Sequence, residues 1–195
     1  MGKTSNAARK VYGQARSAAS GAKRKVRGNR TDPWATTWWR GHKFDNRTVS
    51  ALMWMEKRYL AHGKNRRPFS IGQGSFANGS LSAGTHSGGS SADIGFAGLN
   101  KKQRKAVVKW GRKAGGAIWP REGAAWGTNN DHAHLILLPT GSGKTNASPG
   151  AKTQISAYLN GRDGLAGNGP DTSPRPKPIP RWSHKRNKPY IPNGK

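Results

Sequence analysis

The chain contains no cysteine, few acidic residues and no long hydrophobic run. The absence of cysteine excludes disulfides, iron–sulfur clusters, thiolate catalysis and cysteine-type zinc fingers. No stretch approaches the roughly 18 apolar residues that a membrane-spanning helix requires, so we expect no membrane span. The basic N-terminus also has no apolar segment of the kind found in secretory signals, and we expect no signal peptide.

Basic residues dominate the charge, because 35 Lys and Arg stand against 8 Asp and Glu and give a net charge of +27. Hydrophobic residues make up only 32% of the 195 residues, while Gly (27) and Pro (12) are abundant, so the chain is not packed from end to end. Much of the charge lies at the two ends. Residues 1–30 hold nine Lys or Arg, residues 172–195 hold seven, and neither segment holds an acid.

This distribution predicts three parts, namely a basic N-terminal segment (1–33), a folded domain (34–171) and a basic, Pro-rich C-terminal tail (172–195). The two ends have too few large apolar residues to offset their ordering entropy, so we expect them to behave as disordered, solvated chain. As polycations they are expected to bind an anionic polymer, either teichoic acid or nucleic acid.

The middle of the chain shows both helical and strand patterns. Apolar residues at helical spacing predict helices over 49–60, 101–114 and 151–159, the first capped by Thr48 and the second by Asn100. Short apolar or alternating stretches predict strands over 69–76, 92–96, 117–119 and 134–138. We therefore expect an α+β fold, a single domain in which a small antiparallel sheet has flanking helices.

The residues that carry chemistry lie in two short segments. His86 precedes Asp93 by seven residues across a Gly-rich connection, and His132 and His134 follow closely after Asp131. Imidazole nitrogens and carboxylate oxygens are zinc ligands, and a catalytic zinc keeps three protein ligands and one open position. The pattern predicts His86, Asp93 and His134 as ligands of Zn²⁺, with Asp131 placed to deprotonate a bound water.

The runs SAGTHSGGSSADIG (82–95) and WGTNNDHAHL (126–135) resemble a zinc peptidase family. That family groups D-Ala-D-Ala carboxypeptidases and dipeptidases, phage L-Ala-D-Glu endopeptidases and the hedgehog signalling domain. The resemblance covers about residues 69–138. It implies that His86, Asp93 and His134 hold zinc and that Asp131 is the general base. It also implies that His132 stabilises or protonates the tetrahedral intermediate.

Two positions depart from the family pattern. Gly84 stands where the family usually has a Ser two residues before the first His. The segment FSIGQGSF (69–76) lacks the Arg that the family usually places on the preceding strand, so Gln73 is at best a neutral substitute. The second departure argues against a carboxypeptidase that binds a free C-terminus.

The resemblance leads us to expect a zinc-dependent peptidoglycan peptidase of a phage, either an endolysin or a virion-associated lysin. Such a protein acts from the virion, or from the host cytoplasm once it is released to the cell wall, and its partners are peptidoglycan and virion proteins. The alternative is a non-enzymatic phage structural or nucleic-acid-binding protein with a degenerate peptidase-like domain. The net charge of +27 favours this alternative, whereas the complete zinc pattern favours the enzyme.

Two further features have simpler interpretations. LLPTGSGKT (137–145) resembles the phosphate-binding loop of helicase-type nucleoside triphosphatases. Such a loop must open a helix directly, yet Pro149 and Gly150 follow soon after, so we expect a surface turn. Trp119 and Trp126 are expected to pack in the core rather than line a substrate groove.

Overall fold

The computed structural model describes residues 32–61, 67–77, 84–123 and 130–192. The predicted N-terminal segment therefore lies, up to residue 31, outside the described residues, and so does Trp126. The described elements, in chain order, are β1 (Thr36–Trp39), β2 (His42–Asp45), α2 (Asn46–Ala61), β3 (Ser70–Gln73), β4 (Ser91–Gly95), α3 (Lys101–Lys113), β5 (Gly116–Arg121), β6 (His132–Leu137), α4 (Pro149–Leu159), β7 (Arg181–Ser183) and β8 (Lys188–Tyr190).

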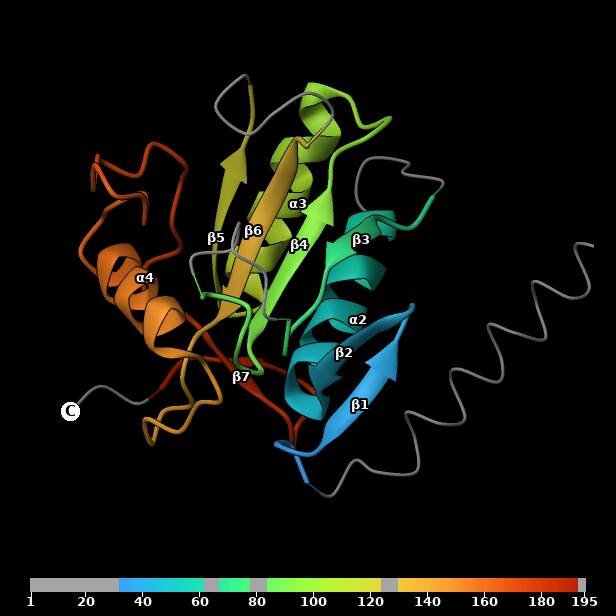
Figure 1. Cartoon of the computed structure of the whole chain (residues 1–195), viewed down its shortest axis with the longest axis vertical. Coiled ribbons are helices and arrows are strands. Elements are labelled where there is room, and N and C mark those ends of the chain that lie inside the picture. Colours follow the sequence, from blue (N-terminus) through green and yellow to red (C-terminus); the bar gives the residue numbers. More distant parts are fainter. Residues whose placement is uncertain (1–31, 62–66, 78–83, 124–129, 193–195) are drawn as a thin grey trace, which may run out of the picture.

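A four-stranded antiparallel sheet forms the centre of the molecule, with the strand order β3-β4-β6-β5 (Figure 1). Two antiparallel hairpins, β1–β2 and β7–β8, lie beside it. Helices α2 and α3 cover one face of the sheet, and α4 lies against the other. The predicted α+β class with a small antiparallel sheet is confirmed. No helix in the described residues is both long enough and apolar enough to cross a membrane.

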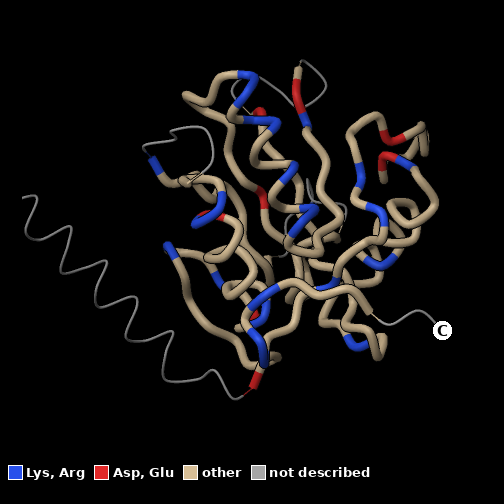
Figure 2. Tube along the Cα trace, turned by 180° about the vertical axis from the view of Figure 1, so that it is seen from behind, with Lys and Arg blue, Asp and Glu red and all other residues tan. Residues whose placement is uncertain are grey.

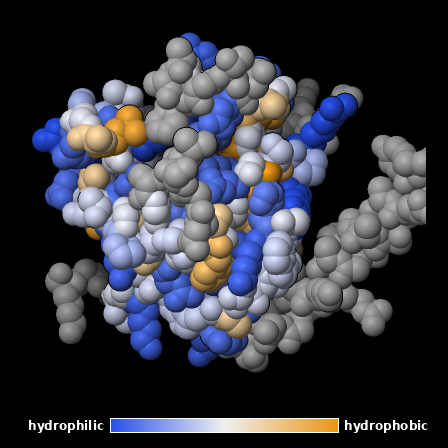
Figure 3. All heavy atoms as spheres, viewed as in Figure 1, coloured by the Kyte–Doolittle hydropathy of each residue, from blue (hydrophilic) through white to orange (hydrophobic). Residues whose placement is uncertain are grey.

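Alternation along the strands separates two hydrophobic cores, because successive side chains point to opposite faces of a sheet. Ile94 and Leu135 point toward α2 and α3 and join the larger core. Trp119 and Ile136 point the other way and pack with α4 through Tyr158. The prediction that Trp119 packs in the core is confirmed. In the view of Figure 3 the described surface is mostly hydrophilic, and its hydrophobic patches are small and separate.

The predicted helices and strands are present, but some boundaries differ. Helix α2 begins at Asn46, and its cap is Asp45 rather than Thr48, because Asp45 Oδ1 accepts the Thr48 backbone N–H at 2.7 Å. The prediction of Asn100 as the cap of α3 is confirmed, and Gln103 completes a capping box. Strand β3 is shorter than the predicted segment 69–76, and a register shift between Ile71 and Gln73 interrupts its pairing with β4.

The C-terminal segment corrects the prediction of a solvated tail. Residues 172–192 pack onto the domain, and the Trp182 side chain is fully buried against Trp54. Arg112 forms a buried, bidentate ion pair with Asp171 and also donates hydrogen bonds to the Ser173 and Pro174 carbonyls. One indole and one buried ion pair thus anchor a segment whose average composition indicated disorder.

Candidate metal centre

The candidate ligands come from two neighbouring strands and the loop that precedes one of them. Asp93 on β4 lies directly opposite His134 on β6, and Asp93 Oδ1 is 2.7 Å from His134 Nδ1. His86 Nε2 lies 3.2 Å from Asp93 Oδ1 and 3.3 Å from His134 Nδ1. The three residues each offer one ligand atom, and these atoms lie within 4.8 Å of one another. The residues that the sequence predicted as zinc ligands are therefore brought together.

Glycines allow the loop before β4 to bring His86 back to the sheet. A Cβ on Gly88 would overlap the backbone around Asn146, and the Gly89 N–H donates to the Asn146 carbonyl at 2.8 Å. The Ser91 hydroxyl donates to the Thr85 carbonyl at 2.8 Å and ties the two ends of the loop together. The loop is therefore held against a segment distant in sequence, which fixes the position of His86.

Hydrogen bonding orients the buried His86 ring. Its Nδ1–H donates to the Gly74 carbonyl at 2.8 Å, which directs Nε2 toward Asp93 and His134. His86 Nε2 lies 3.2 Å from Asp93 Oδ1, so the ring presents this nitrogen to the carboxylate. A backbone carbonyl that fixes the second nitrogen of a histidine is a common support for a metal ligand.

The pKa directions of Asp93 and His134 also favour the binding of a cation. Burial alone would raise the pKa of Asp93, but the hydrogen bonds and charges of His134 and His86 outweigh burial and lower this pKa well below its usual range. Burial lowers the pKa of His134 despite its hydrogen bond to Asp93, so the ring is neutral near pH 7. His134 Nε2 is also buried without a hydrogen-bond partner. A carboxylate beside two imidazole rings, one of which has this buried nitrogen, offers the donor types that a zinc-type ion takes.

The two predicted catalytic residues lie in different surroundings. His132 shares the sheet face of His134, and its Nε2 is 3.8 Å from Asp93 Oδ1, while its Nδ1–H donates to the Asn130 carbonyl at 2.6 Å. Asp131 directly precedes β6, and its carboxylate accepts from Arg104 of α3 at 2.8 Å and from the Gly123 N–H at 2.9 Å. These bonds lower the pKa of Asp131, led by the Gly123 hydrogen bond. Asp131 is therefore paired toward α3, on the side of the sheet away from the candidate ligands.

Sequence reasoning missed Arg121, a buried cation beside the site. Arg121 on β5 lies opposite His132 and is only 4% exposed, and it donates to the Asp163 carbonyl at 2.9 Å. Burial lowers the pKa of Arg121, and the charges of Asp163 and Asp93 oppose this effect. Gln73, which the sequence offered as a neutral substitute for Arg, lies opposite Asp93 on β3. The only sequence signal was that an Arg directly follows the apolar run 117–120.

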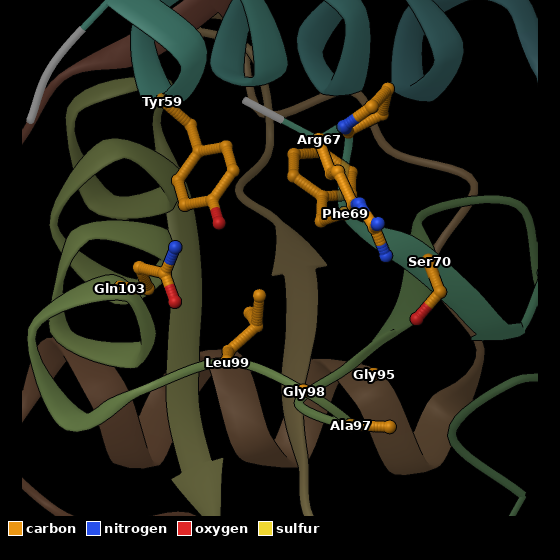
Figure 4. Close-up of a pocket in the computed structure, with 10 residues that line it drawn as sticks. Tyr59, Arg67, Phe69, Ser70, Gly95, Ala97, Gly98, Leu99 and Gln103 are labelled. Carbon is orange, nitrogen blue, oxygen red and sulfur yellow. The ribbon is translucent and has the colours of Figure 1, made fainter. Parts of the chain in front are cut away.

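Two other features lie outside this centre. The loop after β6 forms the expected turn, in which the Thr140 N–H donates to the Lys144 carbonyl at 2.9 Å, and α4 begins only at Pro149. A cavity of about 400 Å³ lies between α2, β3 and the segment after β4. Tyr59 and Gln103 point into it, and Phe69 and Leu99 form part of its wall (Figure 4). None of its described lining residues is a candidate metal ligand.

The chain was compared with protein-family models, with curated proteins and with solved structures, and none of the three comparisons finds a match.

Proposed function

We propose that the protein is a zinc-dependent peptidase that hydrolyses amide bonds in the peptides of peptidoglycan. The observation that carries this proposal is the convergence of His86, Asp93 and His134 at the centre of the sheet. The resemblance of the surrounding sequence to peptidoglycan peptidases supports the substrate class. A phage endolysin or virion-associated lysin is the corresponding setting.

The donor set supports zinc because it combines two imidazoles with one carboxylate, as in many catalytic zinc sites. His86 Nε2, Asp93 Oδ1 and a His134 ring nitrogen would hold the ion. When bound, zinc supplies a Lewis acid for the amide carbonyl and lowers the pKa of a water molecule. The Gly74 carbonyl keeps His86 in the tautomer that a ligand requires.

Further residues near the centre are assigned roles in proton transfer and charge stabilisation. His132 lies on the face of the candidate ligands. The Asn130 carbonyl accepts its Nδ1–H, and its Nε2 lies 3.8 Å from Asp93 Oδ1, where it would accept and return a proton. Arg121, beside His132, adds positive charge that stabilises negative charge developing on a substrate oxygen. The sequence predicts Asp131 as the general base. Because the Asp131 carboxylate is paired with Arg104, we assign this role to His132 instead.

A direct assay tests this function. Purified peptidoglycan of several wall chemotypes is incubated with the full chain, and newly released amino groups are measured. We expect release that a chelator abolishes and that added zinc restores. Lys144→Ala, in the turn after β6, is the matched surface control and should retain full activity.

The alternative is a structural or nucleic-acid-binding virion protein that retains the centre without its activity. The net charge of +27 supports this candidate. If the protein binds zinc but releases no amino groups from any wall chemotype, this result would favour the structural or nucleic-acid-binding protein over the peptidase.

A further inference from the structure

We infer that the face formed by α2, α3 and the β7–β8 turn binds single-stranded nucleic acid. This face lies on the opposite side of the sheet from the metal centre, so it is independent of the proposed peptidase activity. Figure 2 views the molecule from this side. The exposed cations that define this basic helical face are Lys57, Arg58, Lys101, Lys105, Lys109, Lys113, Lys185, Arg186 and Lys188.

Helix α3 contributes a regular line of positive charge. Lys101, Lys105, Lys109 and Lys113 are all exposed and recur every four residues, so they lie along one side of the helix about 6 Å apart. Like charges at this spacing destabilise a helix that has no partner. A linear polyanion that follows the helix would remove this repulsion.

Within the part of the chain that the structure describes, no lysine forms an ion pair with an acidic residue. In the described residues every ion pair is made by an Arg or a His. Glu56 of α2 is paired with Arg40, and Glu122 and Asp131 are both paired with Arg104. The positive field of the basic helical face is therefore directed at solvent or at a partner.

A cavity beside these charges favours nucleic acid over other polyphosphates. It has a volume of about 380 Å³ and is lined by Trp54, Lys57, Arg58 and Asn187, together with Ser50 and Met53. The Arg58 guanidinium lies 5.4 Å from the Trp54 ring centroid, within the range of a cation–π contact. Bases stack on aromatic rings and on guanidinium planes, and an amide can bond to base edges. A wall teichoic acid has no planar base for such a stack.

The cavity and the lysine line belong to one surface. Trp54 of α2 contacts Trp110 of α3 edge to face, with ring centroids 6.1 Å apart. The Lys109 and Lys113 amines lie 5.7 and 5.0 Å from the Trp110 ring centroid. One strand can therefore place phosphates along α3 and a base at Trp54.

The charge component is tested with the full chain and a fluorescent oligothymidine about 20 nucleotides long. The variant Lys105→Gln/Lys109→Gln/Lys113→Gln should bind at least about tenfold more weakly at about 0.1 M salt, and its slope of log affinity against log salt should fall by about two. The control Lys144→Gln/Lys152→Gln/Lys177→Gln removes the same charge elsewhere and should change affinity less than about threefold. Equal loss in both variants would overturn the proposal, because it would mean that only overall charge matters.

The base component is tested with Arg58→Lys, which keeps the charge but loses the planar stack. It should weaken oligothymidine binding at least about threefold and leave binding of an inorganic polyphosphate of equal charge unchanged. Polyphosphate that competes as well as oligothymidine would overturn the proposal in favour of a wall polymer. Unaltered oligothymidine binding by Arg58→Lys would likewise overturn the stacking contact at Trp54.

Discussion

Asp93 and His134 face each other across β4 and β6, and the Asp93 Oδ1 to His134 Nδ1 distance is 2.7 Å. Strand pairing fixes this relationship, whereas His86 reaches the pair through a Gly-rich loop. We therefore expect substitutions in the loop to change metal binding alone, whereas substitutions in the strands should also change the stability of the sheet.

The first prediction concerns the residue proposed to accept and return a proton during hydrolysis. His132→Gln should lower peptidoglycan hydrolysis at least about a hundredfold while zinc stays bound, because general-base catalysis typically contributes at least that much. Asp131→Asn should lower it less than about tenfold, since Asp131 is paired with Arg104. Amino-group release and metal content are measured for both variants. The reverse order of the two losses would assign the base to Asp131, as the sequence predicted.

The second prediction concerns pH and the cap of α2. Burial raises the pKa of Asp45 from 3.8 to about 6, although hydrogen bonds from Thr48 and the charge of Arg47 oppose this rise. The Asp45 carboxyl therefore binds its proton more tightly in the folded protein than in the unfolded chain. As the pH rises from 4 to 6, the free energy of unfolding falls by up to about 3 kcal/mol.

Asp45→Asn keeps the Oδ1 cap and should remove this part of the pH dependence. Urea unfolding at a series of pH values measures it, with the exposed Asp32→Asn as the control. A variant curve parallel to that of the wild type would contradict the prediction.

The third prediction concerns the buried ion pair. Arg112 and Asp171 side chains are 1% and 2% exposed. Asp171→Asn leaves the guanidinium buried without its counter-charge, which typically costs about 3–5 kcal/mol. Denaturant unfolding should show a loss of this size, whereas Asp163→Asn, in a neighbouring loop, should cost less than about 1 kcal/mol.

The fourth prediction concerns the C-terminal segment. Trp182→Ala empties a fully buried site and should lower the free energy of unfolding by about 3–5 kcal/mol. Trp38→Ala, at a site that is 68% exposed, should have little effect. Equal and small losses in both variants would indicate that the segment does not pack as described.

The local patterns of the sequence predicted most of the central sheet and the grouping of the three candidate ligands. Apolar periodicity identified the segments of α3 and β6, and the spacing of His86 and Asp93 anticipated a loop that brings the two side chains together. The C-terminal packing was missed because its stability comes from Trp182 and Arg112, which meet partners distant in sequence. No local pattern indicates such contacts.

The candidate catalytic residues show the same limit of prediction from local sequence. The short spacing between Asp131 and His134 predicted that the two residues lie near each other. The spacing did not show that Arg104 of α3 binds the Asp131 carboxylate. Arg121 was missed because its neighbour His132 lies on another strand, and only the sheet register brings the two together.

Metal analysis of the purified full chain tests the central claim most directly. We expect about one zinc per chain in the wild type, less than about a tenth of that in His86→Ala and in His134→Ala, and full zinc in the control His184→Ala. Circular dichroism confirms that each variant is folded. Wild-type protein without zinc after incubation with the ion, or unchanged zinc in the two ligand variants, would contradict the account.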